Sequence, residues 1–283
     1  TSVTRGTAHG SRAVRARLVL RSRLHDVLQR LRSLVVCGLP TLVAVVGVGM
    51  CRASGAETSP TGPVPITSPM PALTGEPLRY SEEWIHKSLS ELHARFPKQT
   101  RLVSIGRSHE GRPLWALAIG RNVRPRDPRS AILVNGAYYG VETFLIDLAL
   151  DVAEVLLLRS GDEKTAGLRP DPALDRKVRR WLKELVVWCI PVVNTDGVWA
   201  SMHGFARTGR KNGRDNNSNG KPDRGDGVDL NRNYPFRWGF LGDKGSSPLP
   251  ENAYYRGPAA GAEPGTQALM RPADSEHSAA SLP

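Results

Sequence analysis

Hydrophobic and polar positions along residues 79–270 follow the pattern of a domain that mixes helices and strands. Ser81, followed by two glutamates, predicts a helix start, and the apolar stripe after it predicts a helix that continues to about Phe96. Two apolar runs, 102–106 and 114–119, are separated by a polar turn and are typical of a β-hairpin.

Two later apolar runs, 131–136 and 186–193, predict buried strands, and the long segments between them predict helices. Asp171-Pro172 marks a helix start, because aspartate caps helices and proline suits the first helical position. The alternation predicts an α/β fold, a three-layer sandwich with a mixed, largely parallel sheet flanked by helices. Ligands bind beyond the carboxyl ends of such strands, where the turns 139–142 and 194–197 lie.

The N-terminal part of the chain differs in composition from the rest. Residues 1–56 hold nine arginines and one acidic residue, and the run 33–50 is uncharged and rich in Val and Leu. Small residues before Ala56 complete the pattern of a basic leader plus signal peptide, so we expect an exported protein, secreted or periplasmic. A retained N-terminal membrane anchor through 33–50 is the alternative. Residues 57–78 form a Pro/Ser/Thr-rich linker before a domain at 79–283.

Charge changes the picture of possible partners. The whole chain carries +12, but residues 57–283 hold 30 basic and 26 acidic side chains, so most of the excess lies in the leader. The leader lacks interleaved aromatic residues, and we therefore expect no nucleic-acid partner, and a membrane only if the anchor is retained. Three cysteines exclude a disulfide-stapled scaffold.

Two basic segments carry the candidate chemistry: Arg210-Lys211-Asn212 and Asp229-Leu230-Asn231-Arg232-Asn233. Guanidinium groups present planar forks of donors that suit carboxylates and other oxyanions, and a neighbouring amide adds a neutral donor. The pattern indicates a carboxylate-recognition site. A solvated run of charges is the alternative.

Further motifs occur in order along the chain: Ile105-Gly106 with Gly111-Arg112, Asn135-Gly136 with Glu142, 193–197, 210–212, 229–233, and Tyr255-Arg256-Gly257-Pro258 with Glu263-Pro264. This series resembles the zinc metallocarboxypeptidases of the carboxypeptidase A type. The resemblance implies a hydrolase that cleaves the C-terminal peptide bond with zinc-activated water, acting on peptide or protein C-termini.

The resemblance also implies roles for individual residues. Glu142 matches the glutamate zinc ligand, and Arg210 matches the arginine that stabilises the oxyanion. Asn231 and Arg232 match the pair that holds the substrate's terminal carboxylate. Tyr139 occupies the position of the first histidine ligand, and a phenol with a pKa of about 10 is a poor zinc ligand.

The second histidine and the general-base glutamate of the family would follow the helix that begins at Glu263-Pro264, and neither is found before Pro283. His277 lies close to that helix and is expected in a loop. With one of three expected ligands, we expect a C-terminally truncated, incomplete domain with impaired zinc binding and peptidase activity. The alternatives are a non-catalytic pseudopeptidase that binds peptide C-terminal carboxylates, or a non-functional truncated product.

The segment Asp215–Asp226 follows the spacing of an EF-hand calcium loop, with aspartate at the twelfth position. No helices are predicted on either side of it. This favours a polar Gly/Asn loop over a calcium site.

Overall fold

The computed structural model describes residues 77–161, 168–204, 209–223 and 225–273. Its strands are β1 (Thr100–Arg107), β2 (Pro113–Ile119), β3 (Ser130–Asn135) and β4 (Leu185–Ile190). Its helices are α2 (Glu82–Arg95), α3 (Thr143–Ser160), α4 (Pro172–Glu184), α5 (Thr195–Met202) and α6 (Pro264–Ala273), with short 3₁₀ segments η2 (Leu230–Arg232) and η3 (Gly242–Lys244). The predicted hairpin, the two later strands and the helices between them are confirmed to within a few residues.

Several predictions concern other parts of the chain. The leader at 1–56, the linker up to residue 76 and His277 lie outside the described residues. Within the described part of the chain, no helix combines the length and the apolar character of a membrane span. The signal peptide and the anchor therefore stay predictions.

The sheet has the strand order β1-β2-β4-β3. β1 pairs with β2 and β2 pairs with β4 in antiparallel fashion, whereas β3 and β4 are parallel. The sheet is mixed, as predicted, but these four described strands are not largely parallel. The β1–β2 pair is antiparallel because a tight turn joins the two strands, as the predicted hairpin requires. The departure from the prediction is the second antiparallel pair, β2 with β4.

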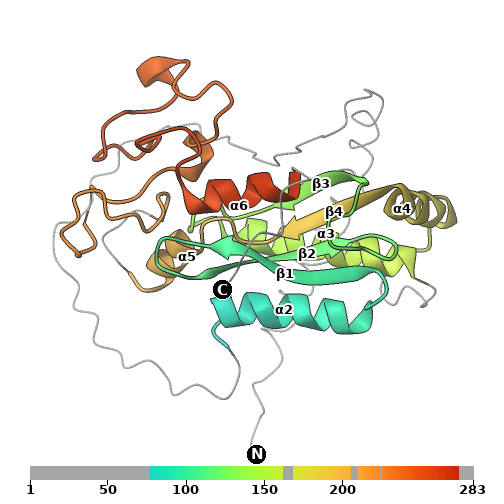
Figure 1. The fold of residues 1–283 in the computed structure, drawn as a ribbon. Coiled ribbons are helices and arrows are strands. Elements are labelled where there is room, and N and C mark those ends of the chain that lie inside the picture. Colours follow the sequence, from blue (N-terminus) through green and yellow to red (C-terminus); the bar gives the residue numbers. More distant parts are fainter. Residues whose placement is uncertain (1–76, 162–167, 205–208, 224, 274–283) are drawn as a thin grey trace, which may run out of the picture. The chain divides into compact units, whose positions relative to one another are not determined.

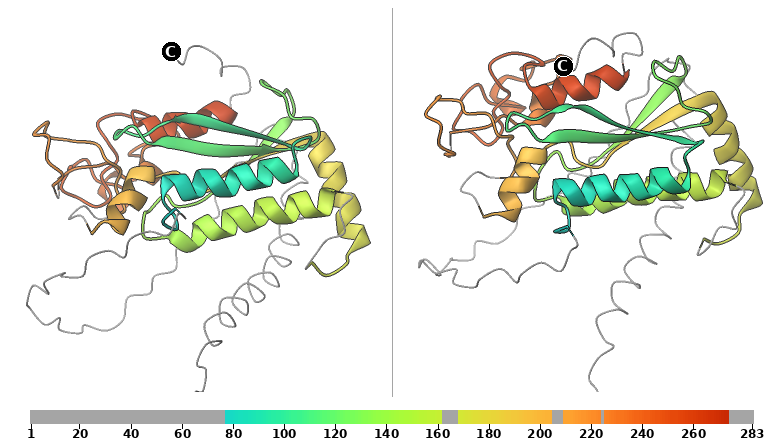
Figure 2. Two further views of the ribbon diagram at one scale, coloured as in Figure 1. Left: turned by 90° about the horizontal axis from the view of Figure 1, so that it is seen from below. Right: turned by 60° about the horizontal axis from the view of Figure 1, so that its bottom comes forward.

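Helices cover both faces of this sheet (Figure 1, Figure 2). On one face α2 packs against β1 and β2, and α3 packs against β3 and β4. On the other face α6 contacts β1 and β3. Leu114, Ile190, Leu230 and Leu269 are buried together between α6 and the sheet. The predicted three-layer arrangement is confirmed.

The carboxyl ends of β3 and β4 lie side by side, because the two strands are parallel neighbours. Asn194, which follows β4, donates from its backbone nitrogen to the Ala137 carbonyl at 3.0 Å. Its side-chain amide donates to the Tyr138 carbonyl at 3.1 Å. The two predicted turns are therefore adjacent.

One of these turns is more regular than predicted. The segment 194–197 is the first turn of α5, because the Asn194 side chain accepts a hydrogen bond from the Gly197 nitrogen at 2.8 Å. This bond satisfies one of the free N–H groups at the helix start. Ser81 caps α2 and Asp171 caps α4 in the same way, as predicted.

Replacing Gly136, the residue after β3, with alanine is expected to lower the free energy of unfolding by about 1–3 kcal/mol. A Cβ atom there would meet the Leu145 carbonyl oxygen at 2.6 Å and the Pro191 carbonyl oxygen at 2.8 Å, and backbone atoms cannot turn aside. Urea unfolding of the full chain measures the effect. Gly225→Ala is the control, since its Cβ would meet only the Asp223 carboxylate, at 3.2 Å. Equal losses in both variants would contradict the steric explanation.

Candidate functional site

The structure brings the predicted site residues together beyond the ends of β3 and β4. Four of them, together with Asp229, form what we call the strand-end cluster: Tyr139, Arg210, Asp229, Asn231 and Arg232. The Arg210 guanidinium lies 3.9 Å from the centre of the Tyr139 ring and 4.3 Å from that of Tyr254. A guanidinium held between two aromatic faces is stabilised by cation–π attraction and loses little freedom when it binds an anion.

The Tyr139 hydroxyl is the centre of this cluster. Its oxygen accepts hydrogen bonds from Arg210 Nη2 at 2.7 Å and from Asn231 Nδ2 at 3.2 Å. Burial raises the pKa of Tyr139, and the Asp229 charge raises it further. The Asn231 hydrogen bond and the charges of Arg210 and Arg232 act to lower it, but the pKa is raised overall. Tyr139 is therefore a neutral phenol at pH 7, and it orients Arg210, predicted to stabilise the oxyanion, and Asn231, predicted to bind the substrate carboxylate.

Asp229 offsets the charge of Arg210. Its carboxylate is fully buried and accepts from Arg210 Nε at 2.9 Å. It also accepts from the Asn231 backbone nitrogen at 3.1 Å, which caps η2. Burial raises the pKa of Asp229, although both nearby arginine charges act to lower it.

Arg232 has a different environment. Its Nη1 donates to the Asn231 carbonyl at 3.3 Å. Its Nε is buried and has no hydrogen-bond partner among the described residues. No ion pair to Arg232 occurs in this part of the chain either. A buried, unpaired guanidinium nitrogen is costly, so this position favours an anionic ligand.

Glu142 lies directly before α3 (Thr143–Ser160), at the end of the predicted 139–142 turn. Its side chain makes no capping hydrogen bond. Burial raises the pKa of Glu142, the Arg210 charge lowers it, and the Asp229 charge raises it. The dipole of α3 favours an ionised carboxylate at the helix start, and these surroundings oppose that effect.

The residues present do not fit a mononuclear zinc ion. A hydroxyl oxygen has two lone pairs, and in Tyr139 both already accept hydrogen bonds, from Arg210 and Asn231. The Arg210 cation also lies against the Tyr139 ring. Nowhere in the described residues do three or more His, Cys, Asp or Glu side chains form a group that could hold a metal ion.

The segment Asp215–Asp226 forms a polar loop closed by its own hydrogen bonds. Asp226 accepts from the backbone nitrogens of Asn216 and Asp223, both at 2.9 Å. Asp223 accepts from the side-chain amides of Asn217 and Asn219. Its carboxylates bind N–H groups within the loop, and no helix flanks it among the described residues. This arrangement agrees with the interpretation as a polar loop.

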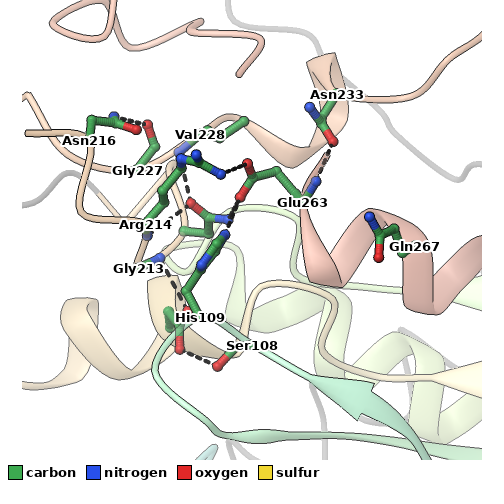
Figure 3. Close-up of polar contacts among 12 residues, drawn as sticks. Ser108, His109, Gly213, Arg214, Asn216, Gly227, Val228, Asn233, Glu263 and Gln267 are labelled. Carbon is green, nitrogen blue, oxygen red and sulfur yellow. Dashed lines mark hydrogen bonds and ion pairs between the residues drawn. The ribbon is translucent and has the colours of Figure 1, made fainter. Parts of the chain in front are cut away.

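A second polar cluster holds the segment that carries Arg210 (Figure 3). Glu263, which is fully buried at the start of α6, accepts hydrogen bonds from Asn212 at 2.6 Å and Arg214 at 3.1 Å. His109, from the turn between β1 and β2, contacts the same carboxylate at 2.7 Å. Three segments far apart in the sequence therefore meet at one side chain.

Two residues of the site were not assigned a role from the sequence. Asp229 belongs to the 229–233 motif, but no role was predicted for it. Its position before Leu230-Asn231 is a capping signal that indicates an ordered turn. Tyr254 gave no signal, because it lies in an irregular loop without periodicity. It is half exposed, and its ring faces Arg210 and Arg232 at 4.3 and 6.0 Å.

The chain is similar to known proteins over most of its described length. It is 28% identical to carboxypeptidase A6 of Mus musculus over 188 residues, which cover 66% of this chain and 37% of that protein. It is 32% identical to metallocarboxypeptidase A of Trichophyton tonsurans over 181 residues, covering 62% and 36%. The chain thus spans about a third of the length of these curated relatives.

Solved structures with a similar arrangement include thrombin activatable fibrinolysis inhibitor, at 22% identity, a TM-score of 0.49, and coverage of 67% of this chain and 42% of that one. Carboxypeptidase A from Helicoverpa armigera gives 23% identity, a TM-score of 0.49, and coverage of 68% and 41%. The sequence model described as zinc carboxypeptidase matches residues 85–281, which is more than half of the chain. The chain therefore belongs to the zinc carboxypeptidase family.

Proposed function

We propose that this domain binds the free C-terminal carboxylate of a peptide or protein at Asn231 and Arg232. The observation that carries the proposal is the Arg232 guanidinium, whose Nε is buried without a hydrogen-bond partner in the described structure. A carboxylate supplies the charge and the acceptor oxygens that this group lacks.

The residues around Arg232 have separate roles in this binding site. Arg210 is paired with Asp229, so the excess positive charge of the cluster lies on Arg232. Asn231 donates one amide hydrogen to Tyr139 and keeps a second for a ligand oxygen. Tyr139 thus fixes the direction of the amide and of Arg210, and binding needs little further ordering of the site.

Recognition without hydrolysis is the function that the described residues support best. Both lone pairs of the Tyr139 hydroxyl are in use, and among the described residues Glu142 is then the single residue at a family ligand position that is free to bind a metal. The relatives bear the names zinc carboxypeptidase and metallocarboxypeptidase. Zinc-dependent release of a C-terminal residue is therefore the alternative for the whole protein, and the same experiment distinguishes the two.

The experiment compares two fluorescent peptides of one sequence, one with a free C-terminus and one amidated. We expect the amide to bind at least about tenfold more weakly, because it loses a charge-assisted hydrogen bond of about 1.5–3 kcal/mol. We also expect a metal chelator to leave the affinity of the free peptide unchanged.

Each other outcome counts against the proposal. Equal affinity for both peptides would show that the carboxylate is not recognised. Loss of binding with chelator would assign the contact to a metal. Release of the terminal residue, followed by mass spectrometry and abolished by chelator, would establish hydrolysis in its place.

A further inference from the structure

The positive charge of the domain is concentrated on one face. The β2–β3 loop (121–130) and the α4 region (171–184) together hold nine basic and four acidic side chains, which we call the basic face. Residues 57–283 hold 30 basic and 26 acidic side chains in all, so 21 basic and 22 acidic ones remain elsewhere. The net positive charge of residues 57–283 therefore comes from the basic face, and the remaining residues of this segment are close to neutral.

The two segments of the basic face are joined directly. The Arg121 backbone nitrogen donates to the Leu182 carbonyl at 2.7 Å, and Arg129 Nη1 donates to the same oxygen at 3.0 Å. A cleft of about 490 Å³ lies between the segments and is lined by Arg121, Asn122, Arg124, Asp127, Arg129 and Lys183. Figure 1 shows α4 and α5 at opposite ends of the sheet, so the basic face is remote from the strand-end cluster.

Most cations of this face are available to a partner. The buried residues of α4 are Leu174, Val178 and Leu182, and its basic residues are exposed. Asp127 is paired with Arg129, Glu184 with Arg180, and Asp175 with Arg159 of α3. Among the described residues, seven cations of the basic face form no ion pair: Arg121, Arg124, Arg126, Arg176, Lys177, Arg179 and Lys183.

The composition of the face suits phosphate groups. Seven of its nine basic residues are arginines, whose planar forks match phosphate oxygens. None of the exposed large apolar side chains of the described structure lies on it. Its one aromatic residue, Trp181, is partly buried. The face therefore offers no exposed apolar anchors for a lipid bilayer and no exposed aromatic platforms of the kind that single-stranded nucleic acids use.

We propose that the basic face binds double-stranded nucleic acid through its phosphodiester backbone, without reading the base sequence. Exposed cations on successive turns of α4 recur about every 5.4 Å, and the cleft beside Lys183 adds two arginines without an ion pair in the described structure, Arg121 and Arg124. Such contacts release counterions from the nucleic acid, so the affinity falls steeply as the salt concentration rises. The proposal is independent of the carboxylate site and revises the expectation that nucleic acid is no partner.

The test uses the full chain and a fluorescent DNA duplex of arbitrary sequence, titrated over a series of salt concentrations. The leader at 1–56 is also basic, so two variants that remove equal charge are compared. One is Arg124→Gln/Arg179→Gln/Lys183→Gln on the basic face. The other is Lys221→Gln/Arg237→Gln/Lys244→Gln, three exposed residues outside it.

We expect the basic-face variant to bind at least about tenfold more weakly, with a salt slope smaller by about 2–3, as three lost phosphate contacts predict. The control variant should change the affinity less than about twofold, because its charges lie elsewhere. A scrambled duplex should bind as well as the first.

Equal losses in the two variants, or no binding by the full chain, would overturn the proposal. So would tighter binding to single-stranded DNA, to a sulfated polysaccharide or to vesicles of anionic lipid, each of which would assign the face to that partner. Circular dichroism checks that both variants fold. If the first does not, Arg126→Gln/Arg176→Gln removes two other exposed charges of the same face.

Discussion

Replacing Arg232 with glutamine is expected to weaken binding of a free peptide C-terminus by at least about 30-fold, which corresponds to about 2 kcal/mol. Arg232 is the cation of the strand-end cluster without an ion pair in the described structure, and its Nε is buried without a partner. Glutamine keeps a donor of smaller size but removes the charge and the fork. Fluorescence anisotropy with the free and the amidated peptide measures the loss.

The matched control is Arg237→Gln, which removes an exposed arginine five residues further along the chain. Its guanidinium contacts the rings of Phe236 and Phe240 and no member of the strand-end cluster. We expect the affinity of Arg237→Gln for the free peptide to change less than twofold, because exposed charges are screened by solvent and salt. If Arg232→Gln weakened the free and the amidated peptide equally, its role would be structural and not carboxylate recognition.

Replacing Glu263 with alanine is expected to lower the free energy of unfolding by about 3–5 kcal/mol, the usual cost of removing one partner of a buried charge cluster. The Glu263 side chain is fully buried and contacts His109, Asn212 and Arg214 (Figure 3). Alanine would leave these donors unsatisfied and separate the start of α6 from the Arg210 segment. Urea unfolding of the full chain measures the change.

Glu263→Gln serves as the control, because it keeps the shape and an acceptor oxygen but removes the charge. Burial acts to raise the pKa of Glu263, but hydrogen bonds from His109 and Asn212 and the charges of His109 and Arg214 outweigh it, so this pKa is lowered. A carboxyl group with a pKa that folding lowers stabilises the protein above its unfolded pKa, here 4.5, and loses that contribution as the pH falls further.

The native chain should therefore lose stability on acidification below about pH 4.5, and Glu263→Gln should lose less over the same range. Stability curves measured at several pH values compare the two. If both proteins lost the same amount of stability on acidification, other carboxylates would be responsible for the acid sensitivity. If the alanine variant were as stable as the native chain, the contacts of Glu263 would contribute nothing to the free energy of unfolding, and the prediction would be wrong.

The local elements were predictable from neighbouring residues alone. The starts of α2 and α4 follow from the capping side chains of Ser81 and Asp171, which act within three residues. The β1–β2 hairpin follows from two short apolar runs around a polar turn. The proximity of Tyr139, Arg210, Asn231 and Arg232 was expected from the family resemblance, whose motifs imply a common site.

Other features depended on contacts between segments distant in the sequence. Periodicity shows which face of a strand is buried but not which strand lies beside it, so the antiparallel β2–β4 pair was missed. The segment 194–197 was predicted as a turn but forms the start of α5. The sequence does not show that the Asn194 side chain accepts a hydrogen bond from the Gly197 nitrogen, and this bond caps the helix.

The same limit applies to the chemistry. Sequence indicates that Tyr139 is a poor zinc ligand, from the nature of a phenol. Only the tertiary structure supplies Arg210 and Asn231, 71 and 92 positions away, as donors to its oxygen. Likewise, the sequence determines the domain's small net charge, but folding places most of its positive excess on one face. Both outcomes arise because the partners of a polar side chain are set by the packing of the whole sheet and its helices, and not by neighbours in the chain.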